Sequence, residues 1–123
     1  MKKYSEEHVW IAIEASSPVL ATVGITVHAQ DVLGDIVFVD LPAIGAVFEA
    51  GATAGVVESV KAAADVYIPA GGTVVEVNEA LRADPSLANT DPLGAGWFFK
   101  ITLTHAQELV ALMDEAAYAN FAP

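Results

Sequence analysis

The sequence predicts a mainly β fold, a sandwich of two sheets with short helices at its middle and at its C-terminal end. Short apolar runs rich in β-branched residues alternate with Gly and Pro along the chain, which is typical of strands joined by tight turns. Apolar residues make up 54% of the 123 residues and charged residues 17%, which is enough to close one core. We therefore expect a single domain over residues 1–123.

The first third of the chain is expected to contain strands and one short helix. Alternating or β-branched apolar runs predict three strands, at residues 8–14, 19–25 and 35–41. Thr26 can cap a helix over residues 27–33, and Gly34 can supply the left-handed residue that ends it. This helix would connect the second strand to the third.

The rest of the chain is expected to hold more strands, a loop and a final helix. Further apolar runs predict strands at residues 53–60, 66–68, 73–77 and 97–103. Two Asp-Pro pairs make residues 81–93 a predicted loop. Residues 104–107 match a capping box, and the apolar face behind it predicts a helix that continues through Tyr118 and contains His105 in its first turn. Three aromatic residues are expected in the core: Trp10, Phe38 and Trp97.

One pair of segments is similar within the chain. Residues 41–49 (LPAIGAVFE) resemble residues 68–76 (IPAGGTVVE), which suggests one strand-turn-strand unit used twice. Two such units would pair into the sandwich, with residues 55–69 as the connection between them. Because the match is short, a turn chemistry that recurs by chance explains it equally well.

Composition excludes several classes of function. The formal net charge is −11, whereas nucleic-acid binding needs clustered Lys and Arg. An acidic surface can steer a protein toward basic partners, or it can simply keep the protein soluble. There is no cysteine, so thiolate metal sites and cysteine nucleophiles are absent. The histidines show no metal-binding helical spacing, and no apolar run approaches a membrane span. We expect a cytoplasmic, non-membrane protein or the mature form of a trimmed one.

Lys61 is the single Lys or Arg between Tyr4 and Leu81. It is followed by three alanines and lies between two predicted strands, so it is expected at an exposed hairpin tip that a modifying enzyme can enclose. By spacing alone, a solvated surface charge remains the more economical interpretation. A Schiff base or a general base would need a desolvated pocket, which a hairpin tip does not supply.

The residues around Lys61 resemble the lipoylation motif of glycine cleavage H-proteins. Similar segments occur in the same order along nearly the whole chain: SEEH before Trp10, VGIT (23–26), AQ (29–30), LGDIVFV (33–39), VESVKA (57–62), EVNEAL (76–81) and GW (96–97). Biotin carriers usually have Met on both sides of the lysine, unlike Val60 and Ala62 here. The lipoyl domains of 2-oxoacid dehydrogenases are shorter, usually have Asp before the lysine, and lack the segments matched at both ends here.

The resemblance implies a non-enzymatic lipoyl-carrier domain with the barrel-sandwich hybrid fold of lipoyl and biotinyl carriers. Lipoic acid would be joined by an amide to Lys61. The implied partners are the enzyme that attaches lipoate, glycine decarboxylase (P-protein), aminomethyltransferase (T-protein) and dihydrolipoamide dehydrogenase (L-protein). The arm would take an aminomethyl group from the decarboxylase to the transferase and then be reoxidised.

The resemblance also implies residues that contact the loaded arm, namely Asp65 and, with less support, His28. Asp65 is equally well explained as a residue that ends the turn through a side-chain hydrogen bond. Two departures from the family remove acid from this region: Val9 and Val27 replace a common Glu and a common Asp. Glu7 or Glu14 are candidates to compensate.

These departures keep a second function open, in which the chain is an H-protein-like lipoyl carrier for lipoate relay or another set of partners. A third possibility, an unmodified interaction module, is opposed by the retained lysine motif. The mass of the isolated protein separates the third possibility from the other two.

Overall fold

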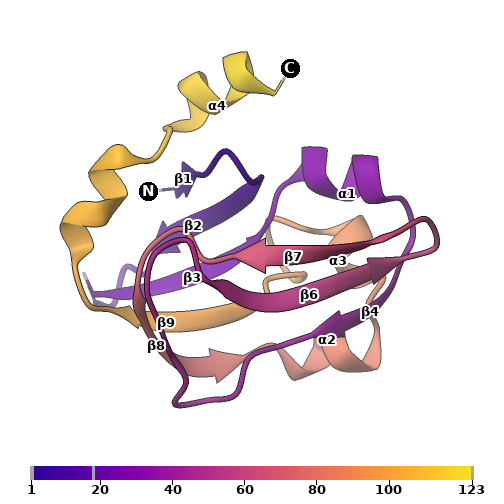
Figure 1. Ribbon diagram of the computed structural model, residues 1–123, viewed down its shortest axis with the longest axis horizontal. Helices are drawn as coiled ribbons and strands as arrows, with labels where there is room; N and C mark the ends of the chain where they lie inside the picture. The colour runs from indigo at the N-terminus through magenta and orange to yellow at the C-terminus, as the bar shows by residue number, and fades with distance from the viewer. Residues whose placement is uncertain (1, 18, 123) are drawn as a thin grey trace.

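The computed structural model describes residues 2–17 and 19–122 and contains two β-sheets flanked by short helices (Figure 1). The larger sheet has the strand order β1-β2-β3-β9-β8-β5 and the smaller sheet the order β4-β6-β7. The strands are β1 (Lys2–Tyr4), β2 (Val9–Ile13), β3 (Leu20–Ile25), β4 (Ile36–Asp40), β5 (Val47–Phe48), β6 (Thr53–Ser59), β7 (Ala63–Tyr67), β8 (Gly72–Val77) and β9 (Phe99–Leu103). The predicted two-sheet fold with short helices is therefore confirmed.

Alternating side chains of the strands build one main core. Its members come from both sheets and from segments far apart in sequence, and they include Val9, Val57, Leu81, Ile101 and Leu109. Trp10 is also buried, as predicted, in a second cluster with Tyr4 and Tyr118, against which the half-buried Trp97 packs. No helix among residues 2–17 and 19–122 is long and apolar enough to cross a membrane.

The two similar segments pair with each other. Strand β5 lies antiparallel to β8, with Val47 opposite Thr73. The backbone N–H of Val74 donates to Ala46 O at 2.9 Å. The hairpin of β6 and β7, residues 53–67, connects the two segments, close to the predicted connection at residues 55–69. This pairing agrees with a unit used twice, although recurring turn chemistry still explains the similarity.

The helix α1 (Val27–Leu33) has the predicted bounds. The Thr26 side chain accepts a hydrogen bond from the backbone N–H of Ala29, so it caps the first turn. Gly34 ends the helix with φ 78° and ψ −153°, a conformation that side chains with a β-carbon avoid. Local sequence signals were sufficient to define this element.

The predicted loop at residues 81–93 is partly wrong. It contains the end of α2 (Glu79–Ala83) and all of α3 (Leu87–Thr90). Each Asp-Pro pair lies outside these helices, at positions 84–85 and 91–92, so the prolines separate short helices instead of preventing them. Leu81 and Ala88 hold the two helices on the core.

The predicted single C-terminal helix is also wrong. The chain forms a 3-10 helix, η1 (Ala106–Ala111), and then the separate helix α4 (Glu115–Phe121). The helix is interrupted because Met113 exchanges backbone hydrogen bonds with Tyr4, at 2.8 and 2.9 Å. His105 precedes η1 and makes no side-chain capping bond, so neither its first-turn position nor the capping box is formed. Asp114 caps α4 instead.

Phe38 was predicted in the core, but its side chain is 50% exposed. The pairing of β4 with β6 advances two residues on β4, from Ile36 to Phe38, for one residue on β6, from Ser59 to Glu58. This bulge makes Val37 an extra residue and turns both Val37 and Phe38 outward. Periodicity in the sequence does not reveal such a shift of register.

Candidate functional site

Lys61 lies in the turn between β6 and β7, as predicted, and the turn projects from one end of the molecule beside α1 (Figure 1). The lysine is exposed, as are Ala62 and Ala63 after it. Within the described residues, Lys61 makes no ion pair, although Glu58 and Asp65 are close in sequence. A second protein can therefore approach the amine from the side of the small residues that follow it, without breaking an ion pair.

Ser59 closes this turn. Its backbone N–H donates to Ala62 O at 2.8 Å. Its side-chain Oγ accepts from the backbone N–H of Lys61 at 3.2 Å and from that of Ala62 at 3.1 Å. These bonds fix the backbone that carries the lysine. Ser59, not Asp65, supplies the side chain that closes the turn.

The stem of Lys61 rests on the end of α1. The lysine Cε lies 3.4 Å from the position that a β-carbon would take at Gly34. Asn89 fixes this segment, because its Nδ2 donates to Gly34 O at 2.9 Å and its Oδ1 accepts from the backbone N–H of Ile36 at 2.9 Å. Asn89 was not singled out in the sequence, because a polar residue in a predicted loop gives no sign of this long-range role.

Asp65 is exposed on β7, opposite Val56. Its Oδ2 accepts a hydrogen bond from the Tyr67 hydroxyl at 3.4 Å. Tyr67 also lines an open cavity of about 680 Å³, together with the N-terminal segment, the residues after β7, and the end of η1 with the residues that follow it. Asp65 is thereby linked to one wall of this cavity.

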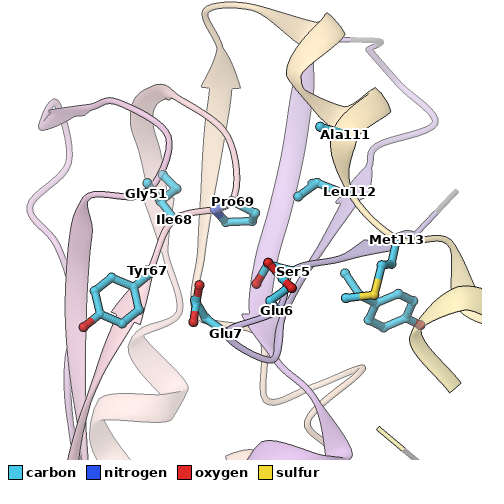
Figure 2. A pocket seen from close by; sticks show the side chains of 11 residues that line it. Ser5, Glu6, Glu7, Gly51, Tyr67, Ile68, Pro69, Ala111, Leu112 and Met113 are labelled. Atoms are coloured by element: carbon cyan, nitrogen blue, oxygen red, sulfur yellow. The ribbon is translucent and has the colours of Figure 1, made fainter. Parts of the chain in front are cut away.

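Glu6 and Glu7 line the same cavity, and in Figure 2 the Glu7 carboxylate lies between the side chains of Tyr67 and Ser5. Glu14, the other candidate to compensate for missing acid, accepts bonds from Lys100 at 2.7 Å and from Thr22 at 3.1 Å. The hydrogen bonds from Lys100 and Thr22 lower the pKa of Glu14. Glu14 is therefore engaged elsewhere, whereas Glu7 faces open volume.

His28 lies in a different environment, on the first turn of α1. It lines a smaller cavity of about 300 Å³ with residues that include Tyr118 of α4. Its ring packs against that of His8 at a tilt of 30°, with the centroids 4.4 Å apart. Sequence spacing did not predict this pair of histidines. The described residues contain no group of three or more His, Cys, Asp or Glu able to hold a metal ion.

His8 connects β2 to the C-terminal helix. Its Nδ1 lies 2.7 Å from the Tyr118 hydroxyl, which is hydrogen-bonded to Thr26 Oγ1 at 2.8 Å. Burial, followed by the charge of His28, lowers the pKa of His8, while Glu7 opposes the shift. Burial raises the pKa of Tyr118 against the opposing effect of the hydrogen bond with Thr26.

The two positions that depart from the family resemblance differ in burial. Val9 is 2% exposed and belongs to the main core, where an ionised carboxylate would be costly without a partner. Val27 is 46% exposed and lines the smaller cavity beside His28. Valine at position 9 thus contributes to core packing, whereas valine at position 27 leaves an apolar surface.

The chain is similar to known proteins along nearly its whole length. Residues 2–123 match the family model described as "Glycine cleavage H-protein". A glycine cleavage system H protein of Chromobacterium violaceum is 58% identical over 118 residues, 96% of this chain and 91% of that protein. One of Thermotoga maritima is 52% identical over 121 residues, 98% of this chain and 95% of that protein. A crystal structure of a glycine cleavage system H protein from Mycobacterium marinum is similar with a TM-score of 0.87 and 39% identity, over 97% of this chain and 94% of that one.

Proposed function

Because this chain belongs to the glycine cleavage H-protein family, we propose that Lys61 is its lipoylated residue, with lipoic acid attached through an amide. The chain is a lipoyl carrier of the glycine cleavage system and not an enzyme. The exposed lysine on a turn closed by Ser59, with small residues after it, is the single observation that carries the choice of residue.

Attachment requires the Lys61 nitrogen to attack the carbonyl carbon of an activated lipoyl donor. The C–N bond forms, the bond to the activating group breaks, and the nitrogen gives up its protons until a neutral amide remains. Lipoate attached there would supply a dithiolane at the end of a flexible arm, and one of its sulfurs would take the aminomethyl group as the disulfide opens and leaves the other sulfur as a thiol. The chain itself contributes a fixed starting point for that arm, since Ser59 and the Gly34 segment define the backbone below it.

We propose that Asp65 helps to hold the protonated amine of the loaded arm, as the resemblance implies. Its link through Tyr67 to the larger cavity supports this role, because Glu6 and Glu7 add negative charge to the lining of the same cavity. We further propose that Glu7, not Glu14, replaces the carboxylate absent at Val9. His28 remains a proposed contact, although it lines the smaller cavity.

The system to which this carrier belongs contains enzymes, and we propose three of them, together with the enzyme that attaches lipoate, as its partners. They are glycine decarboxylase, aminomethyltransferase, dihydrolipoamide dehydrogenase and the enzyme that attaches lipoate. We propose that residues 1–123 act as one carrier domain, supported by a main core whose members extend from Val9 to Leu109. We also propose a cytoplasmic location, with which the absence of cysteine agrees.

The test is the intact mass of the protein after incubation with lipoate, ATP and a lipoate-attaching enzyme, followed by peptide mapping. We expect one lipoyl increment on the peptide that contains Lys61 and none on the matched variant Lys61→Arg. The lipoylated wild type should then support turnover by glycine decarboxylase. An unmodified Lys61 in the presence of a competent enzyme would exclude the proposed site.

A further inference from the structure

The outer side of the three-stranded sheet presents apolar side chains beside Lys61. We define the hairpin face as Val37, Phe38, Asp40, Glu58 and Val60. We propose that this face is the docking surface for the enzyme that attaches lipoate, and that the enzyme presents an apolar hollow bordered by Lys or Arg side chains. This inference rests on the proposed function of Lys61 and adds to it the surface by which one partner recognises the carrier.

The bulge in β4 exposes two adjacent apolar side chains. In a regular strand, successive side chains point to opposite faces, so Val37 or Phe38 would be buried. The register shift between Ile36 and Phe38 leaves both exposed, Val37 by 56% and Phe38 by 50%. Two adjacent exposed apolar side chains on one strand cost solubility, and bulges commonly re-aim side chains next to functional sites.

The bulge lies next to the turn that carries Lys61. Phe38 lies opposite Glu58, and Ile36 lies opposite Ser59, the residue that closes the lysine turn. Val60, next to Lys61, is 66% exposed, and its backbone N–H donates to Asp35 O at 3.0 Å. The apolar side chains of the face thus begin directly beside the lysine and continue along β4.

Acidic residues border the hairpin face. Asp40 and Glu58 are exposed and flank the apolar side chains, and the whole chain has a formal net charge of −11. Lys61 is the single Lys or Arg between Tyr4 and Leu81. A partner with basic side chains around an apolar hollow complements this face, whereas a second copy of the chain would bring acid against acid.

The distance at which each partner acts on the carrier distinguishes the lipoate-attaching enzyme from the other possible partners. Enzymes that act on the loaded carrier meet the end of a long arm, so they can operate at a distance from the hairpin. The attaching enzyme must bring its activated lipoyl donor to the lysine nitrogen itself. Its surface must therefore contact residues close to Lys61. Glu58 and Val60 of the hairpin face are near Lys61 in the sequence, and Phe38 lies opposite Glu58.

The experiment measures steady-state lipoylation of the full chain by a lipoate-attaching enzyme with lipoate and ATP. For the double variant Val37→Ser/Phe38→Ser we expect KM for the carrier to rise about ten-fold with little change in kcat, the size of effect that loss of interface anchors produces. The matched control Ile44→Ser/Val47→Ser removes side chains that are 65% and 71% exposed, at or just before the edge strand β5 of the larger sheet. We expect the control to keep the wild-type KM.

Glu58→Gln tests the charged border of the face. Val60 lies in the turn outside the strands, so Val60→Ser tests the apolar part of the face if the β4 double variant does not fold. We expect Glu58→Gln to raise KM several-fold and to weaken its dependence on salt. Wild-type KM values in all hairpin-face variants would overturn the inference while leaving lipoylation of Lys61 intact. The inference would also be overturned if sedimentation showed that the wild type is a dimer and that the β4 double variant is a monomer. Absence of any lipoyl increment on the wild type would instead overturn the proposed function.

Discussion

The side chain of Lys61 lies over Gly34, with the lysine Cε 3.4 Å from the position of a β-carbon at residue 34. Gly34 has φ 78° and ψ −153°, a region that is essentially restricted to glycine. We predict that Gly34→Ala lowers the free energy of unfolding by about 1–3 kcal/mol, measured by urea denaturation.

Backbone strain and contact with the lysine are separable causes of this loss. In a Lys61→Ala background the lysine stem is absent, so a loss caused by strain should remain unchanged. If the added substitution restored the stability of Gly34→Ala, steric contact with Lys61 would be the cause instead.

The hydroxyl of Ser59 is expected to control the mobility of the lysine turn. Ser59→Ala removes the acceptor for the backbone N–H groups of Lys61 and Ala62. We predict faster amide hydrogen exchange at both residues, with a loss of at most about 1.5 kcal/mol in global stability. Ser59→Thr keeps the hydroxyl and serves as the control. Unchanged exchange in the alanine variant would show that the strands alone fix the turn.

Asn89 is expected to be a stabilising residue of the segment below Lys61. Its side chain bonds to Gln30, Gly34 and Ile36, with donor–acceptor distances of 2.9 to 3.0 Å. We predict that Asn89→Ala lowers the free energy of unfolding by about 1–3 kcal/mol, because it leaves partly buried groups unpaired. The neighbouring substitution Thr90→Ala, at an exposed side chain, should cost less than about 0.5 kcal/mol. Equal losses in the two variants would contradict this role.

His8 is expected to make stability depend on pH. Burial lowers its pKa below the ordinary 6.5, so the unfolded chain binds more protons than the folded chain between the lowered pKa and 6.5. Stability should therefore rise with pH through that window and be lost as pH falls through it. Glu14 acts in a separate window, because its pKa is lowered from 4.5 and its contribution is lost only under more acidic conditions.

The measurement is the free energy of unfolding from about pH 5 to pH 7.5, the range in which histidine titrates. His8 has φ 65°, which Asn adopts with little strain, so His8→Asn removes the titrating ring while keeping the backbone. We expect a shallower slope in this variant. An unchanged slope would assign the pH dependence to another group.

Asp65 and Glu7 are expected to extend the lifetime of the aminomethyl adduct. A carboxylate near the protonated amine stabilises the docked arm, so Asp65→Asn and Glu7→Gln should each shorten the lifetime by several-fold, about 1 kcal/mol of lost interaction. Glu14→Gln is the control, because that carboxylate is engaged with Lys100. Release of formaldehyde and ammonia from the loaded carrier is the quantity to follow, because water that cleaves the bond between sulfur and the aminomethyl carbon leaves a free dithiol and these two products. Wild-type lifetimes in both variants would remove these residues from the site.

Local signals in the sequence were sufficient where local chemistry decides the structure. Thr26 and Gly34 define the two ends of α1 because a capping side chain and a left-handed residue act within one turn. The same applies to Lys61, whose exposure follows from a short turn between two clear strands. The fold class and the position of the lysine were therefore predictable.

Long-range pairing decided the features that the sequence did not reveal. The final helix is broken by hydrogen bonds between Met113 and Tyr4, which are more than a hundred positions apart. Phe38 is exposed because β4 and β6 pair with a shifted register. Asn89 bonds to a segment more than fifty positions away. None of these partners can be identified from a window of neighbouring residues.

The order of strands in the larger sheet has a consequence for synthesis of the chain. Strand β9 lies between β3 and β8, yet it is the last strand to be made. Until residues 99–103 have emerged, β3 and β8 each present an open edge that can pair with another chain. A nascent or truncated chain that ends before Phe99 is therefore expected to aggregate, even though its β6–β7 hairpin, which needs only nearby residues, has already formed.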